Sequence, residues 1–563
     1  MKKQLLSFIV GLCALSANAA PDIIVINADV YTVDPKFPRI EAFAIENGKF
    51  SSLGSSEDIL ALADGKTRVI DAKGNTVTPG FIDAHQHFNG AQTALNLYVD
   101  SHEQWARLIQ KEHESLPQGA WLNGGGWDHT IIDDVLPTRE FLDNIVGDRP
   151  TVLRHIDGHF VWVNTAVLEL AGITADTPVP EGGEIVIDGE TGQPTGILKE
   201  SAMSLIKGLQ PVMTVADRAE KLPHLIHWAN SIGITGMHNM SSYEEFLEVL
   251  ETSDLNLRIW HGYFDVFNSM ENLDERVKEV KALQDSIRNR VATTGKQQAM
   301  GPLFDLGFVK LGNDGVLSVH TAVLLEAYKD KENWHGEWIR KPEDLKTKAE
   351  AFASAGFQIA IHSIGDAAVR ASLDALEAAN QYYVPLPHRI EHVELLNQDD
   401  LPRFAELNVV ASMTPNHMTK AVAYIEERIE PERESEAYLW QSLMNSGAKV
   451  IFGADASTST HQDPLKQIGD AVFRTSHSGF NDGKPWHSEQ SVTFAQALYA
   501  YTQGPASTTD WGEVIGSISV GKWADFVVID GKIREPLSKD IYDRKVQMTY
   551  LAGREVYSAD HDN

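Results

Sequence analysis

Four apolar runs of this sequence end in side chains that can bind a metal ion. His85 and His87 close the first run, and residues two positions apart in a strand point the same way. Two further runs end in His362 and His392, and a fourth ends in Asp455. Imidazole nitrogens and carboxylate oxygens are common ligands of zinc and similar divalent cations. One His-x-His pair has little specificity, but the four run ends together predict a metal site.

Lys310 lies inside an apolar run, residues 307–311, where an unpaired ammonium group is rarely tolerated. An ordinary ion pair, or an amine that reaches out to solvent, would explain it. The alternative is a lysine carboxylated by carbon dioxide, whose two oxygens bridge two metal ions. The one cysteine, Cys13, lies in a segment that we expect to be removed, which excludes cysteine-ligated zinc from the mature chain.

Alternating strand-like and helical patterns surround these residues and predict a parallel sheet. In a (β/α)8 barrel the active site lies at the carboxyl ends of the strands, where the four metal-binding run ends would meet. The predicted barrel strands are residues 79–85, 234–239, 256–263, 306–311, 357–362, 388–393, 408–413 and 449–455. A further strand-like run, residues 151–157, falls in the long gap after the first strand, and we assign this gap to an insertion over the barrel mouth.

Short alternating runs at both ends of the chain predict one small β-domain built from the two termini. The expected fold is therefore α/β, a (β/α)8 TIM-like barrel with a small β-sandwich domain formed by both chain ends and an insertion after the first barrel strand. The expected boundaries are 1–20 for a signal peptide, 21–78 and 511–563 for the two parts of the β-sandwich, 79–510 for the barrel, and about 95–225 for its insertion.

The first twenty residues have the three parts of a signal peptide. Lys2 and Lys3 give a charged start, residues 5–15 are mostly apolar but too short to span a bilayer, and residues 17–19 read Ala-Asn-Ala, a cleavage signal. We therefore expect export, to a bacterial periplasm. We expect no stable membrane insertion of the mature chain, because no later apolar run is long enough to span a bilayer.

The net charge of the chain indicates which classes of partner it can bind. The chain has 48 Lys+Arg against 79 Asp+Glu, a net charge of −31, which would repel nucleic acid and anionic membranes. We therefore expect a small-molecule substrate and no nucleic-acid partner. The sequence leaves open whether the chain forms a homo-oligomer.

An ordered set of motifs resembles the amidohydrolase superfamily, and closely its YtcJ-like branch, the amidohydrolase-3 type. This branch includes N-substituted formamide deformylases and proteins labelled exoenzyme regulatory protein. The resemblance covers nearly the whole mature chain. It is carried by residues 79–87 (Pro-Gly-Phe-Ile-Asp-Ala-His-Gln-His), 157–164 (Asp-Gly-His-Phe-Val-Trp-Val-Asn), 196–200 (Gly-Ile-Leu-Lys-Glu), 362–366 (His-Ser-Ile-Gly-Asp), 389–392 (Arg-Ile-Glu-His) and 516–525 (Gly-Ser-Ile-Ser-Val-Gly-Lys-Trp-Ala-Asp).

The resemblance implies a metal-dependent hydrolase with a divalent metal, expected to be zinc, at one or two ions per chain. The metal ligands that it implies are His85, His87, Lys310, His362, His392 and Asp455. The chain departs from the branch at residues 317–322, where relatives tend to show a Gly-Ser-Arg-Thr-Ala-like segment, so substrate specificity does not carry over from relatives.

The implied chemistry is hydrolysis by metal-activated water. Divalent metals lower the pKa of bound water from 15.7 to about 7 and polarise a scissile carbonyl group. Asp455 is expected to take the proton of that water and return it to the leaving nitrogen. The candidate substrate contacts are Trp127, Asp128, His159, Arg389 and His417, although packing alone would equally explain Trp127 and His159.

Three functions are compatible with these residues. The first is hydrolysis of a non-peptide carbon–nitrogen bond, in an amide or cyclic amide. The second is hydrolysis of an ester-like bond at the same site, since the metal chemistry hardly distinguishes nitrogen from oxygen leaving groups. The third is a non-catalytic regulatory or binding protein on the same fold. A set of ligands that includes a proton-transferring Asp455 favours the enzymes, because a binding protein has no need of it.

Overall fold

The structure is a computed structural model of the chain. It describes residues 20–90, 95, 97, 99, 101–127, 129, 132, 135–155, 160–180, 183–209, 213–318, 320–455, 463–475 and 483–561. The predicted signal peptide lies outside these residues except for Ala20.

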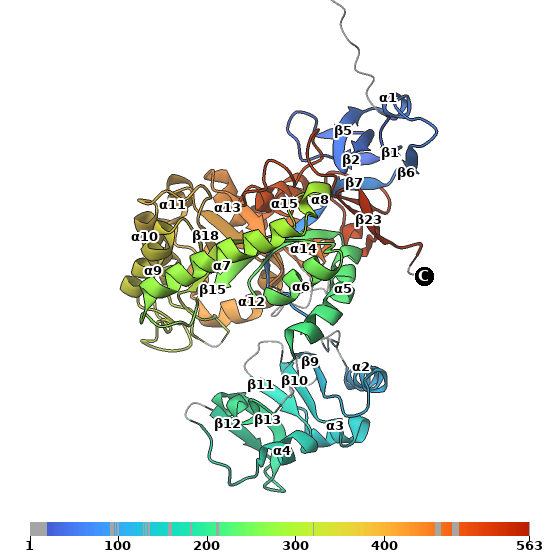
Figure 1. Cartoon of the computed structure of the whole chain (residues 1–563). Coiled ribbons are helices and arrows are strands. Elements are labelled where there is room, and N and C mark those ends of the chain that lie inside the picture. Colours follow the sequence, from blue (N-terminus) through green and yellow to red (C-terminus); the bar gives the residue numbers. More distant parts are fainter. Residues whose placement is uncertain are drawn as a thin grey trace, which may run out of the picture.

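Eight parallel strands form the central sheet and confirm the predicted barrel (Figure 1). Each strand pairs with its neighbour in sequence, except that β8 pairs with β14 across the insertion. The eight strands match the eight predicted segments, with bounds that differ by a few residues. They are β8 (Phe81–Gln86), β14 (Ile234–Asn239), β15 (Arg258–Phe264), β16 (Phe304–Gly312), β17 (Gln358–Ser363), β18 (Arg389–His392), β19 (Val410–Met413) and β20 (Val450–Phe452).

Helices connect these strands in the order that a βα repeat requires. The helices of the barrel region are α5 (Val215–Ser231), α6 (Glu244–Thr252), α7 (Leu273–Thr293), α8 (Gln297–Met300), α9 (Pro342–Ser354), α10 (Asp366–Ala379), α11 (Leu401–Glu406), α12 (Pro415–Arg428), α13 (Trp440–Asn445), α14 (Pro464–Phe473), α15 (Phe494–Ala500) and α16 (Gln503–Ala506). Among the described residues, every helix is too short or too polar to meet the criteria for crossing a membrane.

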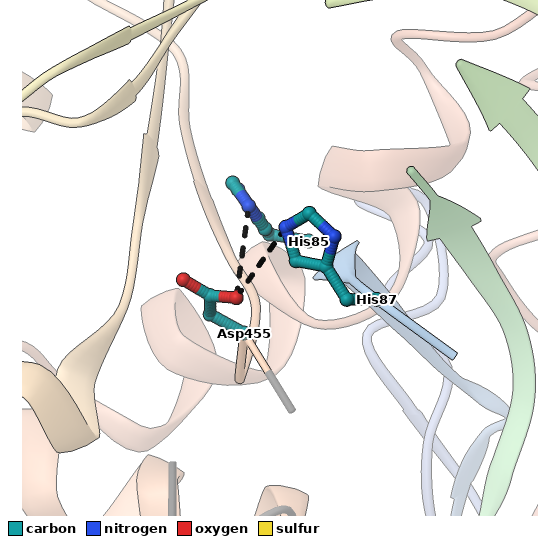
Figure 2. A group of neighbouring side chains, drawn as sticks. All are labelled: His85, His87 and Asp455. Carbon is teal, nitrogen blue, oxygen red and sulfur yellow. Dashed lines mark ion pairs between the residues drawn. The ribbon is translucent and has the colours of Figure 1, made fainter. Parts of the chain in front are cut away.

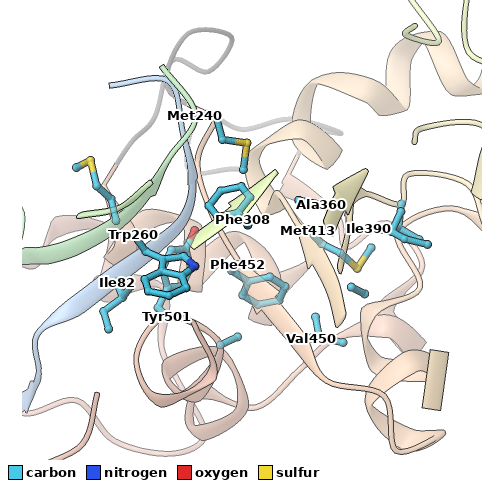
Figure 3. Close-up of a cluster of buried hydrophobic side chains, with 14 of the residues drawn as sticks. Ile82, Met240, Trp260, Phe308, Ala360, Ile390, Met413, Val450, Phe452 and Tyr501 are labelled. Atoms are coloured by element: carbon cyan, nitrogen blue, oxygen red, sulfur yellow. The ribbon is translucent and has the colours of Figure 1, made fainter. Parts of the chain in front are cut away.

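The barrel strands are apolar because both of their faces are covered. Large side chains from different strands meet in the core, among them Trp260, Phe308 and Phe452 (Figure 3). The first and last strands approach closely at Gly453, where a Cβ atom would lie 2.4 Å from the backbone nitrogen of His85. Glycine at this position therefore lets the end of β20 come next to the end of β8.

Two sheets built from the chain ends pack against each other as a β-sandwich. One sheet has the order β5-β4-β1-β6 and the other β23-β22-β21-β7-β2-β3, so the second joins strands from both termini. Their side chains share one core, in which Phe43 contacts Phe526 edge to face with ring centroids 5.1 Å apart. The strands are β1 (Ile23–Ile26), β2 (Asp29–Tyr31), β3 (Arg39–Ile40), β4 (Ala42–Glu46), β5 (Lys49–Gly54), β6 (Arg68–Asp71), β7 (Thr76–Pro79), β21 (Phe526–Ile529), β22 (Val546–Leu551) and β23 (Arg554–Ser558), and α1 (Ser56–Leu60) follows β5.

The segment between β8 and β14 forms a separate sheet with its own helices. Its order is β12-β13-β11-β10-β9, and Figure 1 shows it as a lobe below the barrel in that view. The strand predicted at residues 151–157 is present here as β10. The elements are α2 (His102–Ser115), β9 (Leu122–Trp127), α3 (Arg139–Val146), β10 (Thr151–His155), β11 (Phe160–Val163), α4 (Thr165–Ala171), β12 (Gly183–Ile187) and β13 (Pro194–Glu200).

Candidate metal centre and active site

The ends of the first and last barrel strands bring together two imidazoles and a carboxylate. Oδ1 of Asp455 lies 4.0 Å from Nε2 of His85 and 3.7 Å from Nε2 of His87 (Figure 2). One ligand atom from each residue lies within 4.8 Å of the other two. The backbone amide of Asp455 donates to the carbonyl oxygen of His85 at 2.8 Å, which fixes the two strand ends together. Two nitrogens and one oxygen are a ligand set that suits zinc.

A buried carboxylate orients His85. Nδ1 of His85 lies 2.7 Å from Oε2 of Glu391, and Nε2 of His85 is buried without a hydrogen-bond partner among the described residues. Burial raises the pKa of Glu391, but the Arg389 guanidinium, His85 and Lys310 together outweigh burial and hold this pKa well below its usual value. The ionised carboxylate therefore accepts a hydrogen bond from Nδ1–H. This leaves the lone pair of Nε2 for a metal, an arrangement common around metal-binding histidines. A buried Nε2 without a hydrogen-bond partner, beside the carboxylate of Asp455, fits the binding of a cation.

Arg389 does not line the site, which corrects the substrate contact expected for it. Its side chain is fully buried, and each of its three guanidinium nitrogens has a hydrogen-bond partner. Nε donates to Oε1 of Glu391 at 2.5 Å, and Nη2 donates to the carbonyl oxygen of Ala84 and to Oγ of Ser412. Nη1 lies 2.6 Å from Nδ1 of His238. Arg389 is thus a positioning residue for Glu391 and the end of β8.

Trp127 is likewise not brought to the candidate metal ligands. It is fully buried in the core of the insertion, and its indole nitrogen donates to the carbonyl oxygen of Leu153 at 3.0 Å. The other explanation given for Trp127, packing in a core, accounts for its position. Two further predicted substrate contacts, Asp128 and His159, lie outside the described residues.

His362 and His392 lie side by side at the ends of β17 and β18. Their ring centroids are 4.6 Å apart, and the ring of His392 lies 4.8 Å from that of His85. Nε2 of His362 lies 3.2 Å from the carbonyl oxygen of Gly315. His392 has a φ of 73°, a left-handed conformation that is costly for a residue with a Cβ and is often found at functional sites. His392 is the last residue of β18.

His417 contacts the same cluster. It also contacts Glu394, a residue that the sequence analysis missed. Nε2 of His417 lies 3.9 Å from Oδ2 of Asp455, and Nδ1 lies 3.2 Å from Oε1 of Glu394. His392, Glu394 and His417 form a second group whose ligand atoms all lie within 4.8 Å of one another. Glu394 follows His392 by two residues, so its place in the motif Arg-Ile-Glu-His-Val-Glu was the available signal.

Lys310 is buried in β16, with 2% of its surface exposed. Burial lowers its pKa to about 8, although the carboxylates of Glu391 and Asp455 oppose this shift. The lysine charge in turn contributes to the lowered pKa values of the neighbouring histidines, after the larger effect of burial. Lys310 therefore interacts electrostatically with the cluster, and its lowered pKa gives a larger neutral fraction of the amine at neutral pH than an ordinary lysine has.

Burial keeps the site histidines neutral. It lowers the pKa of His87 to about 4 and that of His362 to about 3, and it lowers those of His85 and His392 as well. Neutral imidazole is the form that binds a metal, so at neutral pH these side chains need lose no proton on metal binding.

Three relationships to known proteins agree with this architecture. The chain is 29% identical over 551 residues to Protein LONG AFTER FAR-RED 3 of Arabidopsis thaliana, an alignment that covers 96% of this chain and 92% of that protein. It is 27% identical over 551 residues to the N-substituted formamide deformylase of Arthrobacter pascens, covering 94% of this chain and 97% of the relative. The crystal structure of an uncharacterized metal-dependent hydrolase from Pyrococcus horikoshii matches with a TM-score of 0.70 at 24% identity, over 92% of this chain and 99% of that chain.

The family comparison is decisive because it covers most of the chain. The model of the amidohydrolase family matches residues 68–557, which include all eight barrel strands and strands from both chain ends. The order of motifs, the barrel and the sequence match all agree. This chain belongs to the amidohydrolase family.

Proposed function

We propose that this protein is a metal-dependent hydrolase that cleaves a non-peptide carbon–nitrogen bond, in an amide or cyclic amide, of a small-molecule substrate. The single observation that carries the proposal is the position of Asp455. Its carboxylate lies against the imidazoles of His85 and His87, where it can both bind a cation and exchange a proton. The relationship to a formamide deformylase supports a carbon–nitrogen bond as the target.

His85, His87 and Asp455 would hold one divalent ion, and the chemistry of nitrogen and oxygen ligands favours zinc. Such an ion, when bound, lowers the pKa of water and polarises a carbonyl group. Lys310, His362 and His392 complete the ligand set proposed from the family resemblance, which would accommodate one or two ions.

Asp455 is proposed to carry the proton of the reaction. Burial raises its pKa, but the nearby His85, His87, His417 and Lys310 together outweigh burial and hold this pKa below its usual value. The side chain is thus a carboxylate at neutral pH and can accept a proton from the attacking water. Returning that proton to the leaving nitrogen restores the carboxylate, a two-step acid–base role. His417, with Nε2 3.9 Å from Oδ2, lies where it can orient Asp455 or contact substrate.

Lys310 is proposed to be carboxylated. Its neutral amine would attack the carbon of carbon dioxide, form a nitrogen–carbon bond and release one proton, which gives an anionic carbamate with two oxygens. Burial and the pKa of about 8 support this reaction, because they make the neutral fraction of the amine larger than in an ordinary lysine. An anionic carbamate would also replace a buried positive charge with a ligand for cations.

The experiment that tests the function compares matched substrates. Purified, metal-loaded protein should be assayed on pairs of N-acyl or N-formyl compounds and esters that share the same acyl group. Hydrolysis of amides that is lost on metal removal is expected. Hydrolysis restricted to the esters would favour the second function named above. A metal-loaded protein that binds members of the panel but hydrolyses none would favour the binding protein.

A further inference from the structure

We propose that Phe264 and Phe267 form an aromatic subsite that binds a phenyl or similar flat apolar group of the amide substrate beside His87. The inference deepens the proposed hydrolase function and rests on it, because it names a class of substrate for the same site. Phe264 is the last residue of β15, and Phe267 lies in the loop that follows. In a (β/α)8 barrel these positions belong to the face that carries the active site.

The two phenylalanine rings follow one another outward from a candidate metal ligand. The ring of Phe264 lies edge to face with the imidazole of His87, with centroids 6.0 Å apart and an interplanar angle of 75°. The ring of Phe267 comes next, with its centroid 6.1 Å from that of Phe264. Both separations fall in the range of about 4.5–7 Å that is typical of interacting aromatic rings. A substrate whose carbonyl group lies at the candidate metal ligands would therefore place a nearby ring against this pair.

Both rings are exposed to solvent. The exposed fraction is 39% for Phe264 and 73% for Phe267. Single exposed apolar side chains are common and need no explanation, but apolar groups that gather at one place on the surface often mark a binding site. Here two aromatic rings contact each other beside a candidate metal ligand, and a bound apolar group would remove both from water.

Buried charges hold the loop that carries Phe267. Nζ of Lys348, on α9, donates to Oδ2 of Asp265 at 2.7 Å and to the carbonyl oxygen of Asn268 at 2.6 Å. The side chains of Lys348 and Asp265 are fully buried, and Nε of Arg276 lies 2.9 Å from Oδ1 of the same carboxylate. These contacts fasten the backbone on both sides of Phe267. A preorganised loop of this kind binds a ligand with a smaller loss of conformational freedom.

The same loop is attached to the end of β16. The backbone amide of Asp265 donates to the carbonyl oxygen of Lys310 at 2.8 Å, and Phe264 pairs with Lys310 in the β15–β16 ladder. Val266 is buried against Gly312, where a Cβ atom would lie 2.4 Å from Cγ1 of Val266. The aromatic pair is therefore held in a fixed place relative to Lys310, another candidate metal ligand.

Amides that differ only by a phenyl ring test the proposal. The kcat/KM of zinc-loaded protein should be measured for N-phenethylformamide against N-ethylformamide, and for phenylacetamide against acetamide, which place the ring on either side of the amide bond. The ratio within a pair reports the ring preference and cancels losses of folded or metal-loaded protein. We expect the wild type to prefer the ring-bearing member of at least one pair by about 10-fold or more. In Phe267→Ala this preference should fall by about 10-fold, the effect of a small apolar contact on specificity.

Three further variants sharpen the comparison. Phe267→Tyr keeps an aromatic ring and should keep the preference, whereas Phe264→Leu keeps apolar volume without the ring and should lower it. Phe37→Ala is the matched control, because Phe37 is 57% exposed but lies between β2 and β3 of the β-sandwich, and its loss should leave the preference unchanged. A wild type without ring preference, or an unchanged preference in either Phe267→Ala or Phe264→Leu, would overturn the proposal.

A second copy of the chain is the other occupant to be tested for an exposed aromatic pair. Sedimentation of the wild type and Phe267→Ala over a range of concentrations measures this, and we expect the same oligomeric state for both. A dimer that is lost in Phe267→Ala, with the ring preference unchanged, would assign the pair to an interface between copies and overturn the subsite.

A carbonyl compound without a bond to nitrogen separates this proposal from the proposed function. Benzylacetone is butanone with an added phenyl ring, so the binding of the two compounds to zinc-loaded protein does not depend on hydrolysis. Stronger binding of benzylacetone that is lost in Phe267→Ala, in a protein that hydrolyses no amide, would support the subsite and contradict the function. Amide hydrolysis with a ring preference that is unchanged in Phe267→Ala would leave the function intact and overturn the subsite.

Discussion

Nδ1 of His85 lies 2.7 Å from Oε2 of Glu391, and both side chains are buried. Glu391 in turn accepts from Arg389, which is fully buried and also holds the carbonyl oxygen of Ala84. This chain of contacts fixes the tautomer of His85 and the end of β8. The orientation of this candidate metal ligand thus depends on a carboxylate from β18, a strand that does not pair with β8.

Glu391→Gln should weaken both metal binding and folding. An amide can keep one hydrogen bond to His85, but the variant leaves the Arg389 charge buried and unpaired, a change that typically costs about 3–5 kcal/mol. Loss of such a partner behind a metal ligand lowers affinity by about 10–100-fold. Chelator competition for zinc and urea unfolding of the metal-free protein measure the two effects. Wild-type affinity in a folded Glu391→Gln protein would remove this carboxylate from the account.

The fold was predictable because its pattern is repeated. Each barrel strand is an apolar run between helical segments, so eight matching segments were visible without any knowledge of contacts. The termini were predicted to join because neither could bury its apolar side chains alone, and Phe43 and Phe526 indeed share one core.

The site was less predictable, because a strand end reveals a residue type but not what surrounds it. Glu391 follows Arg389 by two positions and lies on the same face of β18. The sequence does not reveal the hydrogen bond between the two side chains, which the structure shows. The left-handed conformation of His392 ends this alternation at the last residue of β18. Glu394 was missed for the same reason, since it lies beyond that turn and approaches His417 from a distant part of the sequence.

Lys310→Ala should lose at least one bound metal together with activity. If the lysine is carboxylated, reloading of metal-free wild-type protein should improve when bicarbonate is added, while reloading of the variant should not respond to it. Zinc content after reloading with and without bicarbonate checks this. Equal reloading of the wild type under both conditions, with full activity, would show that the amine is unmodified.

His388 should make the protein less stable in acid. Burial lowers its pKa to about 4, and its Nδ1 atom accepts a hydrogen bond from the amide of Ile359. Because the unfolded chain gains a proton below pH 6.5 while the folded chain does not, stability present above pH 6.5 is lost as the pH falls toward 4. The loss approaches about 3 kcal/mol, at 1.36 kcal/mol per pKa unit.

The matched comparison is His388→Asn, which keeps an acceptor for Ile359 but does not titrate. The difference in unfolding free energy between wild type and variant, measured by urea titration of metal-free protein from about pH 7 to 4, should change in favour of the variant as the pH falls. Parallel curves for the two proteins would contradict the assignment.

Export of the protein stays a prediction from the sequence. The charged start, the short apolar run and the Ala-Asn-Ala sequence at residues 17–19 predict that mass spectrometry of the mature protein finds residues 1–19 or 1–20 removed. A periplasmic protein that still begins with Met1 would contradict it.

The most direct test of the account is the turnover of Asp455→Asn at known metal content. The substitution keeps the shape of the side chain but removes the proton acceptor that faces His85 and His87. Turnover on an amide substrate should be measured in wild type and variant that carry the same amount of bound zinc. We predict a fall of about 10²–10⁴-fold, the usual contribution of general acid–base catalysis. Near-wild-type turnover at equal zinc content would contradict the proposed role of Asp455 and, with it, the mechanism.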